Sequence, residues 1–275
     1  MKIYGHKGTV IGVGVNLLAD RAGDLDFTTV KTGLAASVIR SLDYKSVNVI
    51  SFGAEANFIS TRFDITKMVG FEGEPLIAQG LPNKSKYFTY SAGFGWFYNP
   101  DKDRSIYAGA ALSHLNQPDV TFTKGLAQQG LVDSDFGAIN LFTKLVLHAG
   151  GSFKISRNFK ILPSAIFSDQ GPHQEILAGG FLRYANRASG PDPISFYLGA
   201  WFRGYLAGDV KGSDAAVVTI RADLKKTYFA LSYDFNVSTW KRASRGAGGA
   251  ELSVIHILDL DKHSKKLEDI YCPGL

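Results

Sequence analysis

The residues best suited to nucleophilic chemistry are His148, Ser152 and Asn158, which follow one another over a short stretch of sequence. A serine nucleophile needs a base within hydrogen-bonding reach and a third group that orients this base. On a β-strand, His148 and Ser152 would share a face, but their positions would be about 13 Å apart. This is too far for a direct hydrogen bond. The sequence therefore predicts two polar side chains on one sheet face and no enzyme.

Metal and cofactor sites are not predicted either. The segment DLDKHSKKLEDI (259–270) begins with alternating ligand types, like a calcium loop, but Ser264 and Ile270 replace the required glycine and glutamate. His114 has no second ligand cluster beside it and is expected to be a hydrogen-bonding anchor. The glycines in GVG (12–14) and GAGGAE (246–251) lack the following helix that would hold a phosphate.

The composition excludes some classes of protein. A hydrophobic fraction of 45% excludes a disordered chain. The net charge of +5 comes from scattered residues, apart from KRASR (241–245) and KHSKK (262–266), so we expect solvated loops and no nucleic-acid partner. No stretch of 18 continuous apolar residues suggests a transmembrane helix. The N-terminal residues also lack the apolar core of a signal peptide.

The elements that must position any functional residue are strands. In TYFALSYDFNVS (227–238), apolar side chains alternate with small or polar ones, and a strand turns successive side chains to opposite faces. The apolar face consists of Phe229, Leu231, Tyr233, Phe235 and Val237. In a soluble sandwich this face would meet a second sheet, whereas in a membrane barrel it would meet lipid.

The same alternation recurs along the chain and predicts about twelve strands in one domain. These candidate strands are 9–19, 26–40, 47–59, 87–98, 105–114, 140–155, 159–167, 174–184, 194–203, 215–224, 227–238 and 250–258.

Strand length and loop length favour a barrel in lipid over a soluble sandwich. Several segments reach about ten residues, which a tilted strand needs to cross a bilayer. Tight connections at 41–46, 99–104, 156–158 and 225–226 alternate with long ones at 60–86, 115–139, 204–214 and 239–249. Outer-membrane barrels have short periplasmic turns and long outer loops. The fold prediction is therefore all-β, a transmembrane antiparallel β-barrel over 1–258, with a periplasmic tail at 259–275.

Aromatic residues near the segment ends support the same fold. Trp96, Trp201 and Trp240 are expected to belong to a girdle at the lipid headgroups. In a soluble sandwich, by contrast, polar residues such as Glu55, Asn57, Arg221 and Asp223 would simply form the solvent face. The alternation of loop lengths decides between the two interpretations.

Several motifs occur in a specific order. They are LLADRAGDL (17–25), YAGAALSHLNQPDVTF (107–122), FYLGAWFRG (196–204), FALSYDFNVS (229–238), GGAELSVIHI (248–257) and a Cys-Pro ending at Cys272 and Pro273. As a set, these motifs resemble the PorP/SprF family of type IX secretion system outer-membrane proteins from Bacteroidetes.

The chain also departs from the family pattern. Family members carry a signal peptide, a segment rich in Asn-Pro-Ala and a Tyr-Arg-x-Gln-Trp-like strand before the point where this sequence starts. We therefore expect either a truncated chain or a start codon placed too late, because two further strands would give the roughly fourteen strands that the resemblance implies. The ending CPGL also lacks the basic and aromatic residues that usually follow Cys-Pro.

The resemblance implies a non-enzymatic protein of the bacterial outer membrane. Its expected role is to assist the secretion or surface anchoring of large cargo proteins, such as adhesins and gliding motility proteins. Its expected partners are outer-membrane lipid, other type IX components and the cargo. For Cys272, a structural or docking role is favoured over redox catalysis. The alternative is a passive pore or solute channel, which would need an open lumen lined by charge.

The family motifs also supply positions of structural or docking interest. They are Ser113, His114, Leu115, Asn116, Gln117, Pro118, Arg203, Ser232, Tyr233, Asp234, Asn236, Ser238, Glu251, Cys272 and Pro273.

Overall fold

The computed structural model describes residues 2–6, 8–67, 83–122, 139–186, 194–207, 210–238 and 248–258. Within this part of the chain the structure is a single antiparallel sheet and one short 3-10 helix, η1 (Ile65–Lys67). No helix of the described residues has the length and hydropathy needed to cross a membrane.

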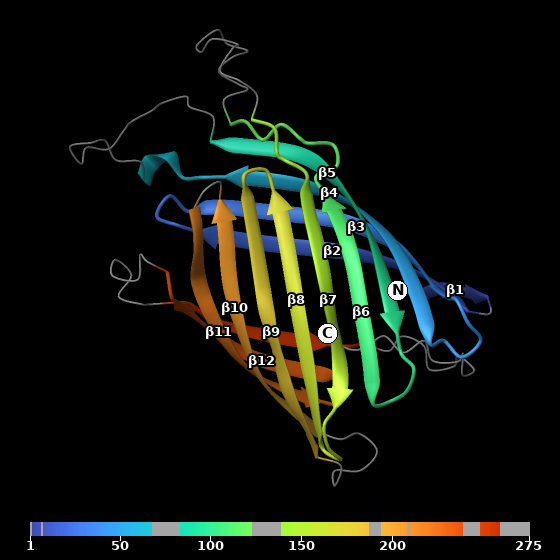
Figure 1. Cartoon of the computed structure of the whole chain (residues 1–275). Coiled ribbons are helices and arrows are strands. Elements are labelled where there is room, and N and C mark those ends of the chain that lie inside the picture. Colours follow the sequence, from blue (N-terminus) through green and yellow to red (C-terminus); the bar gives the residue numbers. More distant parts are fainter. Residues whose placement is uncertain are drawn as a thin grey trace. The chain divides into compact units, whose positions relative to one another are not determined.

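Thirteen strands make up the described sheet (Figure 1). They are β1 (Lys2–His6), β2 (Thr9–Ala22), β3 (Phe27–Ser41), β4 (Asn48–Arg62), β5 (Lys84–Tyr98), β6 (Arg104–Ser113), β7 (Lys144–Lys154), β8 (Phe159–Gln170), β9 (His173–Asn186), β10 (Ile194–Ala207), β11 (Val210–Leu224), β12 (Thr227–Asn236) and β13 (Ala250–His256).

The strands follow one another in the sheet in chain order, from β1 to β13. Sequential antiparallel pairing is what tight turns between neighbouring strands produce. The all-β prediction is confirmed, and each of the twelve expected strands has a counterpart. The structure adds β1, which is too short for alternation to reveal it.

One predicted loop was wrong. Residues 204–214 were expected to form a long loop, but β10 and β11 continue through most of this segment and pair as far as Ala207 with Val210. A shift in register between Arg203 and Gly204 accommodates an irregularity there. Gly212 lies next to the Tyr205 side chain of β10, whose hydroxyl would be 2.7 Å from a Cβ at this position.

The two faces of the strands are opposite to those of a soluble sheet. In β12 the apolar side chains are the exposed ones, with Leu231 at 55%, whereas Ser232 and Asp234 on the other face are half-buried. The deepest buried side chains include the polar residues Asn57, Thr89 and Ser195. Burying Ser and Thr while exposing Leu and Phe is unfavourable in water, so the apolar face needs an apolar medium.

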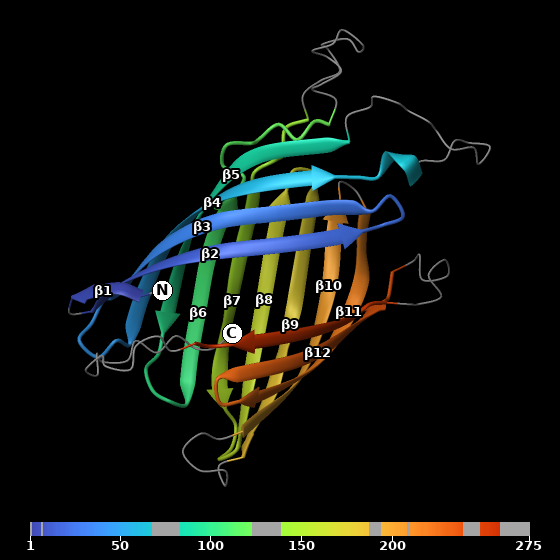
Figure 2. The same ribbon diagram turned by 180° about the vertical axis from the view of Figure 1, so that it is seen from behind.

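The chain divides into two compact units. Unit 1 comprises residues 1–39, 52–93 and 111–144, and unit 2 comprises 40–51, 94–110 and 145–275. Within unit 2, strands β8, β9, β10 and β11 lie side by side in both Figure 1 and Figure 2, and the register is continuous from β8 to β10.

The tight turns are stabilised by side chains. In the connection between β3 and β4, the Asp43 carboxylate accepts hydrogen bonds from the backbone amides of Val47 at 2.8 Å and Asn48 at 2.7 Å. These bonds hold the pKa of Asp43 below its usual value. Ser46 in this turn and Lys225 in the turn after β11 have positive φ values of 53° and 56°.

Candidate functional site

The motif residues that follow β6 form a turn anchored to the neighbouring strand β5 in unit 1. His114 and Gln117 have positive φ values of 58° and 43°, which fold the chain back on itself. The Gln117 amide donates to the His114 carbonyl at 2.9 Å, and the Leu115 amide donates to the Tyr90 carbonyl at 3.0 Å. The chain therefore leaves β6 in a defined direction.

Asn116 continues the pairing with β5 through its side chain. Its Nδ2 donates to the Phe88 carbonyl at 2.9 Å, and its Oδ1 accepts from the Tyr90 amide at 3.3 Å. An amide side chain supplies both a donor and an acceptor, as a backbone peptide does. Aspartate could not donate to the carbonyl, so this position requires asparagine or a close equivalent.

His114 anchors the turn from the polar face of the sheet. Its Nδ1 lies 2.9 Å from Oγ1 of the buried Thr89. Burial lowers the pKa of His114, and the positive charges of Lys144 and Lys31 lower it further. His114 therefore attaches the start of the turn to β5 through this hydrogen bond.

The same turn also holds the far end of the connection from β6 to β7. The Pro118 carbonyl accepts from the Leu141 amide at 2.9 Å. Thr143 Oγ1 donates to the His114 carbonyl at 3.3 Å, and Gln117 Nε2 lies 3.4 Å from the same hydroxyl. We refer to residues 114–118 with 141–143 as the turn clamp. It fixes both ends of the long connection.

The connection from β4 to β5 is fixed at its base in a similar way. The Phe63 amide donates to the Asn83 carbonyl at 3.1 Å, and Asn83 Nδ2 donates to the Phe63 carbonyl at 3.0 Å. The Asp64 amide donates to the Leu25 carbonyl at 2.8 Å, which ties the segment before η1 to the turn between β2 and β3.

An ion cluster and an aromatic cluster complete this attachment. Arg21 and Lys67 both pair with the Asp26 carboxylate, and hydrogen bonds from Arg21 and Lys67 lower the pKa of Asp26 to about 2. The Phe122 ring lies 5.3 Å from Phe63 and 6.2 Å from Phe27 between ring centroids. We refer to these six residues as the loop base. Because Phe63 and Phe122 belong to different connections, the loop base joins the two long loops of unit 1.

Arg203 occupies the centre of a charged cluster in unit 2. Its Nε lies 2.9 and 3.0 Å from the two carboxylate oxygens of Asp214 on β11, and its guanidinium lies 3.5 Å from Asp234 on β12. The three side chains are about one third exposed. Each strand contributes one charge to the polar face, so the cluster ties β10, β11 and β12 together.

The remaining motif residues of unit 2 serve local structure. Ser232 shares a hydrogen bond of 2.9 Å with Thr219, and Asn236 Oδ1 accepts from the amide and hydroxyl of Ser238 at 3.0 and 2.7 Å. Tyr233 is exposed on the apolar face, and Glu251 accepts a hydrogen bond of 3.3 Å from the Ser253 hydroxyl. Ser113 is the last residue of β6.

Sequence reasoning missed a second cationic cluster in unit 2, centred on Tyr197. The Arg221 guanidinium lies 4.9 Å from the ring centroids of both Tyr197 and Tyr228, and Arg183 lies 5.7 Å from the Tyr197 ring. Arg221 also pairs with Asp223 at 2.7 Å. Arg221 and Asp223 are two positions apart and hence share a face, but only the register of β9, β10 and β11 brings the tyrosine between the arginines.

In the rejected catalytic set, the structure shows an aromatic neighbour for His148. His148 packs against Tyr107, with ring centroids 6.0 Å apart. Across the described ranges, no group of three or more His, Cys, Asp or Glu residues could hold a metal ion. Cys272, Pro273 and the tail 259–275 lie outside the described residues, as does Trp240.

The comparisons identify the family. A sequence model described as type IX secretion system membrane protein PorP/SprF matches residues 3–254. The chain belongs to the PorP/SprF family. It is therefore a component of the type IX secretion system in the bacterial outer membrane.

Other comparisons found less. No curated protein matches the chain. Among solved structures, the CymD monoaromatic hydrocarbon channel is similar to this chain, with 13% identity, coverage of 86% of this chain and 76% of the channel, and a TM-score of 0.48.

Proposed function

We propose that this PorP/SprF protein assists the secretion or surface anchoring of specific large cargo proteins, through the two long connections of unit 1. The observation that carries the proposal is the loop base, which joins the connection from β4 to β5 with that from β6 to β7. Recognition loops are commonly held by a rigid scaffold, because a loop fixed at its base loses less conformational entropy on binding.

The placement of these loops supports the proposal. Strands that pair antiparallel in chain order send alternate connections to opposite ends of the sheet. Connections 63–83 and 114–143 therefore leave from the same strand ends, whereas 187–193 leaves from the other ends. We propose that the first two face outward toward cargo. The opposite ends and the tail 259–275 would then face other type IX components.

The first experiment replaces residues 68–82 with a short Gly-Ser linker and leaves the loop base intact. The matched control replaces residues 187–193 with the same type of linker. Each variant is expressed in the native host from which the wild-type gene has been deleted. Quantitative proteomics then compares the cell surface and the medium, and uptake of small solutes is measured in parallel.

We expect the first variant to lose one or a few large surface proteins while the control keeps them. Surface labelling of the variant itself must show that it reaches the outer membrane in normal amount. An unchanged surface proteome after both replacements, and after complete deletion, would contradict the proposal. Impaired uptake of a solute with a normal surface proteome would instead support a channel.

A further inference from the structure

A polar pocket lies at the tight-turn ends of β6, β7 and β8 in unit 2. Its volume is about 600 Å³, and it is lined by Asp101, Asp103, Arg104, Lys154, Ile155, Ser156 and Arg157. The residues come from the turn between β5 and β6 with the first residue of β6, and from the last residue of β7 with the turn between β7 and β8. Within unit 2 the two turns are joined by a backbone hydrogen bond of 2.9 Å from Lys154 to the Asp103 carbonyl.

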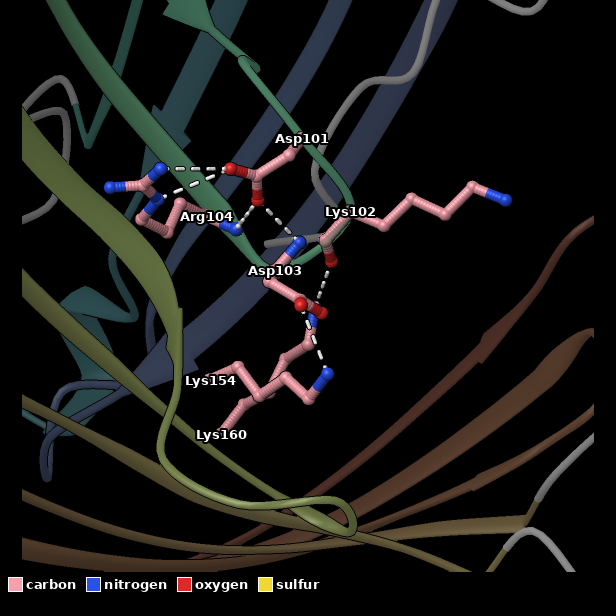
Figure 3. Close-up of polar contacts among 6 residues, drawn as sticks. All are labelled: Asp101, Lys102, Asp103, Arg104, Lys154 and Lys160. Atoms are coloured by element: carbon pink, nitrogen blue, oxygen red, sulfur yellow. Dashed lines mark hydrogen bonds and ion pairs between the residues drawn. The ribbon is translucent and has the colours of Figure 1, made fainter.

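The two acidic residues of the pocket are already occupied by the chain itself (Figure 3). The Asp101 carboxylate accepts from the amides of Asp103 and Arg104 at 2.8 Å and pairs with the Arg104 guanidinium at 3.1 Å. Asp103 pairs with the Lys154 ammonium at 2.9 Å. Both carboxylates therefore serve to hold the turns and the basic side chains in place.

The basic residues are in excess. Lys102 and Lys160 flank the pocket, and Lys160 donates to the Lys102 carbonyl at 2.7 Å. Five basic side chains, Lys102, Arg104, Lys154, Arg157 and Lys160, stand against the two aspartates. Arg157 makes no hydrogen bond or ion pair with the described residues, and Figure 3 shows the Lys102 ammonium directed away from the other charges. The pocket thus attracts an anion.

Exposed apolar side chains lie in the pocket and at the strand ends next to it. Ile155 lines it and is 64% exposed, and the exposed Ile106 and Phe159 lie at the adjoining ends of β6 and β8. Apolar side chains followed by cationic ones at a strand end match the two parts of a phospholipid, its acyl chains and its headgroup.

We propose that this pocket binds the phosphate of an anionic phospholipid headgroup, with the acyl chains against the exposed apolar side chains beside it. Arg157 is the lining cation left to contact the phosphate. A guanidinium can donate two parallel hydrogen bonds to the oxygens of a phosphate or of a carboxylate. An aspartate-rich peptide could therefore also bind the guanidinium, but it would have no use for the apolar surface beside the pocket. The exposed Ile155 therefore favours lipid over an acidic protein segment.

The test is native mass spectrometry of the full-length protein in detergent, with dioleoylphosphatidylglycerol and dioleoylphosphatidylcholine added at equal concentration. We expect the anionic lipid to be retained more than the zwitterionic one. Arg157→Gln should lower retention of the anionic lipid about fivefold, as expected for one lost charge-assisted hydrogen bond at a partly solvated site. Arg157→Lys should restore part of it.

The matched control is Lys45→Gln. Lys45 is an exposed residue in the tight turn between β3 and β4, which lies at the same strand ends as the pocket and also belongs to unit 2. Retention of lipid should not change in this variant. Heat-modified mobility on gels confirms that each variant is folded.

Three results would overturn the proposal. One is equal retention of the two lipids by the wild-type protein. Another is an equal loss of retention in Arg157→Gln and Lys45→Gln, which would indicate a general charge effect. The third is displacement of the anionic lipid by inorganic phosphate or by polyglutamate at millimolar concentration, which would assign the pocket to a free anion or to an acidic protein segment.

Discussion

Gly179 shows how closely the backbones of β9 and β10 approach each other. A Cβ at this position would lie 2.1 Å from the Ala200 carbonyl oxygen and 2.7 Å from the Trp201 Cα, both of them backbone atoms. The Trp201 ring lies next to the position that a Cβ of residue 179 would occupy, and its centroid lies 4.4 Å from that of Phe181. A methyl group therefore cannot enter without moving the strand.

We expect Gly179→Ala to lower the free energy of unfolding by roughly 1–3 kcal/mol, the usual cost of overpacking. The control is Gly14→Ala, since a Cβ at Gly14 would meet nothing within 4 Å. Urea titration of each protein refolded into phospholipid vesicles measures the difference. Equal stability of the two variants would contradict the close approach.

The pH response of His114 follows from its lowered pKa. The unfolded chain takes up a proton near pH 6.5, whereas the folded turn clamp takes it up only at lower pH. The contribution of His114 to stability is thus complete above pH 6.5 and decreases as the pH falls below it. NMR titration of the histidine ring should give a pKa below that of a free imidazole.

The stability of the turn clamp gives a second way to measure the protonation of His114. Amide hydrogen exchange at residues 114–118 should become faster between pH 6.5 and 5, after correction for the intrinsic pH dependence of exchange. In His114→Gln this extra pH dependence should be absent. A ring pKa at or above 6.5 would show that burial and the charges of Lys144 and Lys31 do not act on His114 as the structure indicates.

At the scale of elements, the segment at η1 depends on the Asp26 carboxylate. Its pKa of about 2 means that folding favours the charged form. The stabilisation is therefore present above the unfolded pKa, near 4, and is lost as the pH falls toward 2. Asp26→Asn removes the charge at all pH values and leaves Arg21 and Lys67 without their shared partner.

We expect Asp26→Asn to increase proteolytic cleavage within residues 63–83 severalfold at pH 7, because the segment opens more often. The control is Asp24→Asn, which changes an exposed acidic residue in the same turn. Limited proteolysis followed by mass spectrometry locates the cuts. Equal cleavage in both variants would mean that the ion cluster does not hold the loop base.

At the scale of the whole molecule, the reversed distribution of polar and apolar side chains sets the medium in which the protein is stable. Leu231 lies at the middle of β12 and is exposed on the apolar face of this strand. A charged side chain at this position would have to leave water for the apolar part of the bilayer.

Leu231→Arg is therefore expected to lower the stability of the protein in vesicles by about 2–4 kcal/mol. Leu231→Phe should cost little, since this face has no tightly packed protein core in which a larger side chain would clash. Unfolding titrations of the two variants in the same vesicles measure the effect. Equal stability of both would place Leu231 outside the lipid-facing surface.

Much of this fold follows from the alternation of apolar and polar residues alone. Successive residues of a strand point to opposite faces, so odd-numbered and even-numbered positions of one strand lie on different faces. This alternation correctly grouped Phe229, Leu231 and Phe235 on the apolar face of β12. It also placed Arg203 of β10 and Asp234 of β12 on the polar face of the sheet. The turn residues near Gly204 and Gly212 were misleading. They resembled a loop, but pairing with neighbouring strands overrode their local preference.

The sequence by itself therefore determined twelve of the thirteen described strands, their two faces, the family and the positions of the motifs. Only the tertiary structure decided which motif residues meet. The partners of Arg203, the ring of Tyr197 between two arginines, and the joining of the two loops at Phe122 all depend on pairing between strands and on packing between connections. The reason is physical: alternation along a strand is a local property, whereas register and ring packing involve residues far apart in the chain.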